Sequence, residues 1–408
     1  MGKYTIYGEN VDNYLQKNYM EKIITSFKRD VRERLIAIIL FGGFAKGEGS
    51  IQIINNKAIP FNDFDFYVIT KEKLSDETLD SISHNASKEI GMGGMEIAYF
   101  PGERYDVKKF FHVDVRCIPY DLLPKLMKTQ RYYELKYKSQ VIYGDPQILG
   151  LIPEIKPEDI PFSEGLRNLF NKLHTMLLGL REEYTEDQKK ISIFWSYKSY
   201  ISCCESLLIL AKVFAPSSLE RSKLFSKIYK EKFPDLYEKI PNLAQKVQIA
   251  TNFKVRLDFS VDHDKLWRTA LKDLLTVFEY FLKQVTHHDV VTALTKDLPY
   301  SYFEPYLKEK IGFNFYPAQY MLNLGYYKVL RDKKEGYMRP LFHWKDVGIR
   351  MIIPMYYLLK FRLENKIEFL DKAYFELQKF IRVEKKEFWH LRERSLKAFG
   401  LYYQQRLL

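Results

Sequence analysis

The chain has 408 residues and a formal net charge of +12, with 46% hydrophobic and 28% charged residues. This composition is typical of a globular protein and excludes disorder as its main character, and the length predicts two or three domains. Three cysteines cannot form a disulfide framework, and no apolar run is long enough to span a bilayer. Because the N-terminus also has no signal-peptide pattern, we expect a cytoplasmic protein with no membrane partner.

Charge is distributed unevenly along the chain. Residues 1–150 carry a net charge of +1, whereas the rest of the chain carries +11. This bias favours an anionic partner, such as nucleotide phosphates, RNA or an acidic surface. Lysine-rich helices that are merely well solvated would produce the same bias, so both interpretations stay open.

The first 150 residues alternate between strand-like and helix-like patterns. A buried strand is predicted at 35–41, further strands at 63–69, 96–100 and 112–118, and helices at 12–34, 75–90 and 132–143. This order predicts an α/β (α+β) head with a mixed sheet as the first domain, 1–150. A linker with three prolines, 153–162, follows it.

Beyond the linker the apolar spacing is helical nearly throughout. Helices are predicted at about 164–183, 189–213, 219–232, 242–252, 263–285, 343–364 and 366–404. Ser218, Asp262 and Asp289 are predicted helix N-caps. The prediction is therefore a helical bundle, 163–290, and a mainly α-helical C-terminal domain, 291–408.

A glycine turn follows the first predicted strand. Gly42 and Gly43 end the run LIAIILF and lead into FAKGEGS. Such a turn leaves backbone N–H groups unpaired, and small residues let phosphate oxygens approach them. The same glycines would also serve as simple steric relief at a turn.

Three aspartates stand on predicted strands. Asp63 and Asp65 are two residues apart, so they project to the same face, and Asp114 lies on a later strand. Carboxylates crowded together repel unless a cation lies between them, and hard oxygen ligands suit Mg²⁺. The alternatives are two ordinary surface aspartates and an Asp114 paired with Arg116.

Taken together, these parts resemble the nucleotidyltransferase fold of the DNA polymerase β superfamily. Strand, Gly-Gly turn, short helix, D-x-D strand and later strand aspartate occur in that order, and GGFAKGE resembles the family passage G-S-x-A-R-G-E. The resemblance covers about residues 30–145. This chain departs from the family by a longer spacing between Gly43 and Asp63, and the excess, 50–60, is predicted to form an inserted hairpin.

The resemblance implies a site for transfer of a nucleoside monophosphate. Asp63, Asp65 and Asp114 would be catalytic and would hold two Mg²⁺ ions, with Mn²⁺ as an alternative. A nucleoside triphosphate, most simply ATP, would lay its phosphates on Gly42 and Gly43. Further nucleotide-binding candidates are Lys46, Ser50 and, from the helical part, Lys198; Lys46 would face either phosphate or solvent, and Lys198 is otherwise a lysine extending from a half-buried helix.

The acceptor is left open by the sequence. A small-molecule or protein hydroxyl ranks above RNA because no recognised RNA-binding module occurs. The alternatives are a catalytically inactive nucleotide- or RNA-binding module that regulates another protein through its helical part, and a structural helical adaptor. Oligomeric state and nucleobase preference are not predicted.

Overall fold

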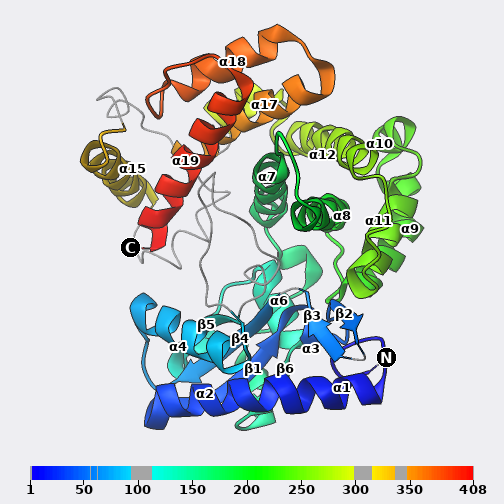
Figure 1. The fold of residues 1–408 in the computed structure, drawn as a ribbon, viewed down its shortest axis with the longest axis vertical. Helices are drawn as coiled ribbons and strands as arrows, with labels where there is room; N and C mark the ends of the chain where they lie inside the picture. Colours follow the sequence, from blue (N-terminus) through cyan, green and yellow to red (C-terminus); the bar gives the residue numbers. More distant parts are fainter. Residues whose placement is uncertain are drawn as a thin grey trace.

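The fold was analysed in a computed structural model that describes residues 2–55, 57–61, 63–92, 113–297, 315–335 and 347–407. Figure 1 shows a sheet-containing head below a mainly helical remainder. The predicted fold class, an α/β head followed by a helical C-terminal region, is confirmed. The strand predicted at 96–100 lies outside the described residues.

The head is built on a four-stranded mixed sheet. Its strands are β1 (Leu35–Phe41), β4 (Phe64–Thr70), β5 (Val113–Pro119) and β6 (Gln140–Tyr143), in the order β5-β4-β1-β6. β1 runs antiparallel to β4 and β6, while β4 and β5 run parallel. The strands predicted at 35–41, 63–69 and 112–118 are therefore confirmed to within one residue at each end.

The sheet is buried on both faces, as the continuous aliphatic run of β1 predicts. Ile38 and Leu40 face the core under α1 (Glu9–Leu15), α2 (Glu21–Val31) and α4 (Asp76–Glu89). Ala37 and Ile39 point to the opposite face and join the core of the helical part. Because successive strand side chains alternate between faces, one strand connects the two cores.

Two short features follow β1. The chain turns through α3 (Gly42–Ala45) and then forms a hairpin of β2 (Ile51–Ile54) and β3 (Lys57–Pro60), in which Gln52 pairs with Ile59. The inserted hairpin predicted at 50–60 is thus confirmed. Asn55 at its tip has a φ of 50°, a conformation that asparagine tolerates.

The helix predicted at 132–143 is wrong in its second half. The helix α6 (Gln130–Lys138) ends at Ser139, and the next four residues form β6, where Val141 pairs with Ile39 of β1. Hydrogen bonds to β1 satisfy the backbone N–H and C=O groups of these residues. Local periodicity does not reveal this pairing, because β1 is distant in the chain.

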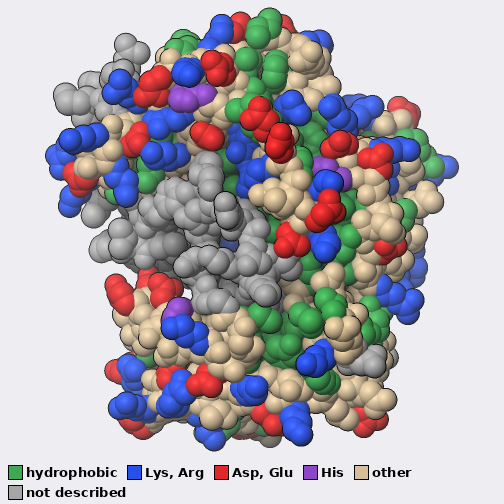
Figure 2. Space-filling model, viewed as in Figure 1, with side chains coloured by type: hydrophobic (Ala, Val, Ile, Leu, Met, Phe, Trp, Pro, Cys, Tyr) green, Lys and Arg blue, Asp and Glu red, His purple; other side chains and the backbone are tan. Residues whose placement is uncertain are grey.

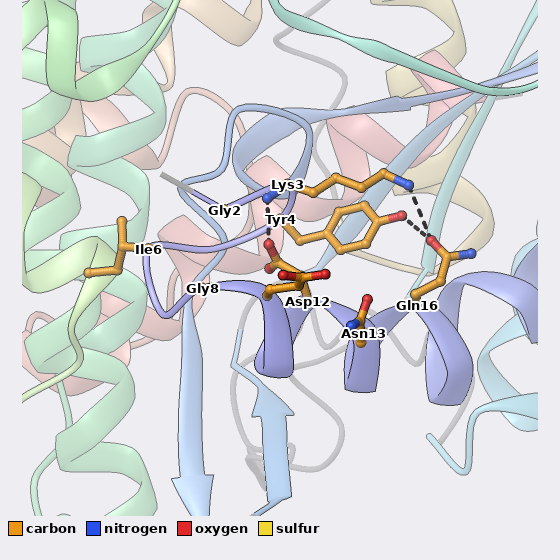
Figure 3. Close-up of a pocket in the computed structure, with 9 residues that line it drawn as sticks. Gly2, Lys3, Tyr4, Ile6, Gly8, Asp12, Asn13 and Gln16 are labelled. Carbon is orange, nitrogen blue, oxygen red and sulfur yellow. Dashed lines mark hydrogen bonds between the residues drawn. The ribbon is translucent and has the colours of Figure 1, made fainter.

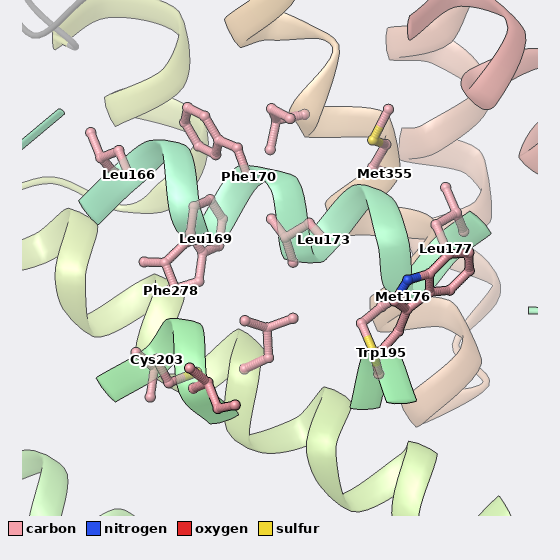
Figure 4. Close-up of a cluster of buried hydrophobic side chains, with 14 of the residues drawn as sticks. Leu166, Leu169, Phe170, Leu173, Met176, Leu177, Trp195, Cys203, Phe278 and Met355 are labelled. Atoms are coloured by element: carbon pink, nitrogen blue, oxygen red, sulfur yellow. The ribbon is translucent and has the colours of Figure 1, made fainter. Parts of the chain in front are cut away.

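The helical bundle follows the prediction closely. It contains α7 (Phe162–Gly179), α8 (Glu186–Leu210), α9 (Ser218–Lys232), α11 (Leu243–Val255) and α12 (His263–Thr286). Asp262 and Asp289 are N-caps as predicted, but α9 is capped by Ser217 in a capping box with Glu220, one residue before the predicted Ser218. Figure 4 shows apolar side chains of α7 meeting Trp195 and Cys203 of α8 and Phe278 of α12.

The C-terminal helices pack on this bundle. They are α15 (Phe315–Asp332), α16 (Val347–Arg350), α17 (Ile352–Glu364), α18 (Ile367–Leu377) and α19 (Phe388–Leu407). The single helix predicted at 366–404 is wrong, because the chain leaves α18 after Leu377 and resumes as α19. Met355 of α17 joins the core around α7, so the C-terminal helices and the bundle share one apolar cluster (Figure 4).

The remaining short turns of helix connect these elements. They are η1 (Gln16–Met20), η2 (Arg32–Arg34), η3 (Tyr120–Lys125), η4 (Pro146–Leu151), η5 (Pro157–Asp159), α10 (Pro234–Lys239), α13 (Val290–Thr292) and η6 (Ala293–Asp297). In the described ranges, no helix combines the length and the apolarity needed to cross a membrane.

Candidate active site

The three aspartates lie at the same end of two neighbouring strands, called here the acidic edge of the sheet. Asp65 in β4 pairs in register with Asp114 in the parallel strand β5, and Asp63 stands just before β4. On the other side of β4, Asp65 is opposite Phe41, the last residue of β1. This end of the sheet, where β1 ends and β4 and β5 begin, therefore carries the D-x-D segment, the later aspartate and the glycine turn.

The carboxylates influence each other electrostatically. Burial raises the pKa of Asp65 well above its ordinary value, and the negative charges of Asp63 and Asp114 raise it further. Arg116 and Lys198 oppose this shift. A divalent cation would relieve the same repulsion, and the carboxylate oxygens are suitable ligands for Mg²⁺.

The three carboxylates do not, however, form a complete metal-binding site. The Asp114 carboxylate accepts a hydrogen bond from Arg116 Nη2 at 3.0 Å, which realises the ion pair left open by the sequence. Across the described ranges, no group of three or more His, Cys, Asp or Glu residues is placed to hold a metal ion. The carboxylate donors nevertheless fit a divalent ion.

The glycine turn lies directly against Asp65. Gly42 has a φ of +70°, and a Cβ placed on it would lie 3.2 Å from Cγ of Asp65 and closer still to Oδ2. A Cβ on Gly43 would lie 3.2 Å from the Glu48 carbonyl oxygen and 3.7 Å from Cε of Lys254 in α11. Only glycine fits both the backbone conformation and the space at residue 42.

Lys46 and Ser50 have partners at the joint between the head and the bundle. Lys46 pairs with the buried carboxylate of Glu134 in α6, and that carboxylate also accepts from Arg221 of α9 at 3.0 Å. The Ser50 hydroxyl donates to the Lys254 carbonyl at 2.6 Å. Lys46 is buried, so it does not face solvent, which was one of its two predicted alternatives.

Glu48 was missed by the sequence analysis. Its buried carboxylate accepts from the amides of Ser218 and Leu219, at 3.1 and 2.9 Å, and pairs with Lys254 at 3.3 Å. Burial alone would raise the pKa of Glu48, but Lys254 and the Leu219 amide together lower it to about 2. A carboxylate of the head therefore caps the start of α9. Glu48 and Ser218 are 170 residues apart in the chain, so no local pattern predicts this contact.

The charges of the aspartates influence two lysines of the bundle. Burial lowers the pKa of Lys198 in α8, and Asp63 and Asp65 oppose this shift. Burial, with a contribution from Lys198, lowers the pKa of Lys172 in α7 to about 7. The sequence analysis selected Lys198 and missed Lys172; a lone lysine within the apolar pattern of α7 is the signal that could have found it.

A separate cavity of about 660 Å³ lies where the N-terminal segment folds over α1 (Figure 3). Its lining includes Asp12, which accepts from the Lys3 and Thr5 amides, and Gln16, which accepts from Lys3 Nζ and the Tyr4 hydroxyl. These polar groups form hydrogen bonds with one another, and the bonds hold the N-terminal segment against α1. None of the three aspartates lines this cavity.

On the face in Figure 2, Lys and Arg side chains lie interspersed with Asp and Glu. No protein-family model and no curated protein sequence matches the chain. One similar solved structure is a spectinomycin adenyltransferase from Enterococcus faecialis with ATP and spectinomycin, at 13% identity and a TM-score of 0.35, covering 62% of this chain and 97% of that chain. A similarity of this size carries no argument about family or activity.

Proposed function

We propose that this protein is a metal-dependent nucleotidyltransferase, which transfers a nucleoside monophosphate from a nucleoside triphosphate to an acceptor hydroxyl and releases pyrophosphate. The observation that supports this most is the register of Asp65 with Asp114 on parallel strands, with Asp63 two residues earlier and Gly42 against the Asp65 carboxylate. Carboxylates beside a glycine turn provide metal ligands and a phosphate-accessible backbone at one place.

Each residue has a distinct task in this proposal. Asp63, Asp65 and Asp114 would hold the divalent ions, Mg²⁺ or Mn²⁺. When bound, the metal lowers the pKa of the attacking hydroxyl and neutralises the leaving pyrophosphate. Gly42 and Gly43 let the triphosphate approach the backbone, and Lys198 supplies a positive charge opposite the carboxylates. In-line attack on the α-phosphorus then forms the new P–O bond to the acceptor as the bond to pyrophosphate breaks.

The test compares Asp65→Asn with Asp121→Asn. Asp121 is an exposed aspartate just beyond the opposite end of β5, so it controls for the same chemical change away from the site. Both variants and the wild type are assayed for Mg²⁺-dependent ATP binding by calorimetry and for pyrophosphate release with a panel of hydroxyl acceptors. We expect Asp65→Asn to lose about a hundredfold or more in transfer at an unchanged unfolding temperature, and Asp121→Asn to behave as wild type. Undiminished transfer by Asp65→Asn would refute the assignment.

One observation favours a second candidate, a catalytically inactive nucleotide-binding module. The Asp114 carboxylate is engaged by Arg116, and the described residues contain no finished three-ligand metal group. In that case the wild type binds Mg²⁺-ATP but releases no pyrophosphate with any acceptor. The variant Arg116→Met distinguishes the two candidates further: freeing Asp114 should raise the transfer rate of an active enzyme and should leave an inactive module without pyrophosphate release.

A further inference from the structure

Tyr67 of β4 carries a buried hydroxyl group that has no hydrogen-bond partner among the described residues. The residue as a whole is only 3% exposed. A buried hydroxyl without a partner destabilises the fold, because it has given up its hydrogen bonds to water and gained none in return. Phenylalanine would fill the same space without that cost, so packing alone does not account for a tyrosine at this position.

Tyr67 lies next to the acidic edge, on the face of the sheet that carries the aspartates. It follows Asp65 by two residues along β4, and strand side chains alternate with a period of two. Its partner on the parallel strand β5 is Arg116, just as Asp114 is the partner of Asp65. The two pairs are therefore consecutive rows on one face. Solvent reaches this face at β5, where the side chains of Asp114 and Arg116 are 25% and 44% exposed.

The Tyr67 ring is also in contact with the row of the aspartates. In the antiparallel pairing with β1, Tyr67 is opposite Ile39, and Asp65 is opposite Phe41. The Tyr67 ring nevertheless packs edge-on against the Phe41 ring, with 5.6 Å between the ring centres and 80° between their planes. The tyrosine thus joins the aspartate row by a ring contact as well as by its place on β4.

The order of groups along β4 assigns Tyr67 to one side of the proposed reaction. Gly42 follows Phe41, the residue opposite Asp65, so the glycine turn and Tyr67 stand on opposite sides of Asp65. In an in-line displacement the attacking oxygen approaches the α-phosphorus from the side opposite the leaving pyrophosphate. With the pyrophosphate at the glycine turn and the α-phosphorus at the aspartates, the acceptor approaches from the side of Tyr67.

We propose that the Tyr67 hydroxyl binds the acceptor through a hydrogen bond to a polar group next to the attacked hydroxyl, so that the site selects acceptors that carry such a second group. This rests on the proposed function, because it names the acceptor class of the same site. Consecutive rows on one face of a strand are about 6.6 Å apart, so Tyr67 and the carboxylates address different atoms of the acceptor. A phenol both donates and accepts, which suits a second hydroxyl, a carbonyl or an amide.

The experiment compares the wild type with Tyr67→Phe and Tyr327→Phe in the full chain. Each variant loses one buried hydroxyl that has no partner among the described residues, but Tyr327 lies in α15, in the C-terminal region. The acceptors are supplied in two matched pairs, ethanol with ethylene glycol and cyclohexanol with cyclohexane-1,2-diol. In each pair the second member adds one hydroxyl beside the attacked one. Transfer from Mg²⁺-ATP is measured as pyrophosphate release above that with water alone.

The wild type is expected to prefer the diol of each pair about tenfold or more in kcat/KM, and Tyr67→Phe is expected to lose that preference. The affinity for a non-hydrolysable ATP analogue, measured by calorimetry, should not change. The unfolding temperature of Tyr67→Phe should not fall, because the variant removes an unsatisfied group. Tyr327→Phe should keep the preference for diols.

Two results would overturn the inference and leave the proposed function standing. One is transfer by the wild type without a preference for diols, or with a preference that Tyr67→Phe keeps. The other is a weaker affinity of Tyr67→Phe for the ATP analogue, which would place the hydroxyl at the nucleotide. If the wild type releases no pyrophosphate with any acceptor, the proposed function itself fails, and the assignment of Tyr67 to the acceptor fails with it.

Discussion

Gly42 and Asp65 are in such close contact that no side chain can be added between them. A Cβ on Gly42 would lie 3.2 Å from the carboxylate carbon of Asp65, and Gly42 has a φ of +70°. The turn after β1 and the central aspartate of β4 therefore depend on each other for their positions.

Replacement of Gly42 by Ala should abolish Mg²⁺-ATP binding and lower the free energy of unfolding by about 1–3 kcal/mol, because it adds both left-handed strain and a clash. Gly91 is the matched control: its φ is +76°, but a Cβ there meets nothing within 4 Å. Gly91→Ala should cost about 1 kcal/mol in urea denaturation and leave ATP binding intact. Equal ATP affinities in the two variants would show that the contact with Asp65 is irrelevant to the site.

Lys46 should matter for stability rather than for phosphate binding. Glu134→Gln leaves the buried Lys46 ammonium without a carboxylate and should cost about 3–5 kcal/mol, whereas Lys46→Met leaves Glu134 paired with Arg221 and should cost less. The double variant should be more stable than the sum of the single effects implies, as measured in a urea double-mutant cycle. A large loss of ATP affinity in Lys46→Met, with stability unchanged, would instead place Lys46 on the phosphates.

Glu48 should make the head–bundle joint sensitive to acid. Its pKa falls from an ordinary 4.5 to about 2 in the folded protein, so its contribution is present above pH 4.5 and is lost as the pH falls toward 2. The size of this shift corresponds to about 3 kcal/mol. Glu48→Gln should therefore lower the free energy of unfolding most near neutral pH, and its difference from wild type should shrink in acid. Glu182→Gln, at an exposed position, should show no such pH dependence.

The sequence by itself determined the local elements of this protein and the order of its candidate site residues. The aliphatic run 35–41, the hairpin at 50–60 and the bundle helices follow from periodicity and turn residues, because their formation depends mainly on near neighbours in the chain. The D-x-D pattern likewise placed Asp63 and Asp65 on one face, since strand side chains alternate with a period of two.

Only the tertiary structure decided which of these residues meet. Three contacts join segments far apart in the chain: the pairing of 140–143 with β1, the burial of Lys46 against Glu134 and the capping of α9 by Glu48. Such contacts depend on how the head and the bundle pack, and no local pattern records that packing. The same packing sets the charges around Asp65, because burial and neighbouring charges, not residue type, control its pKa.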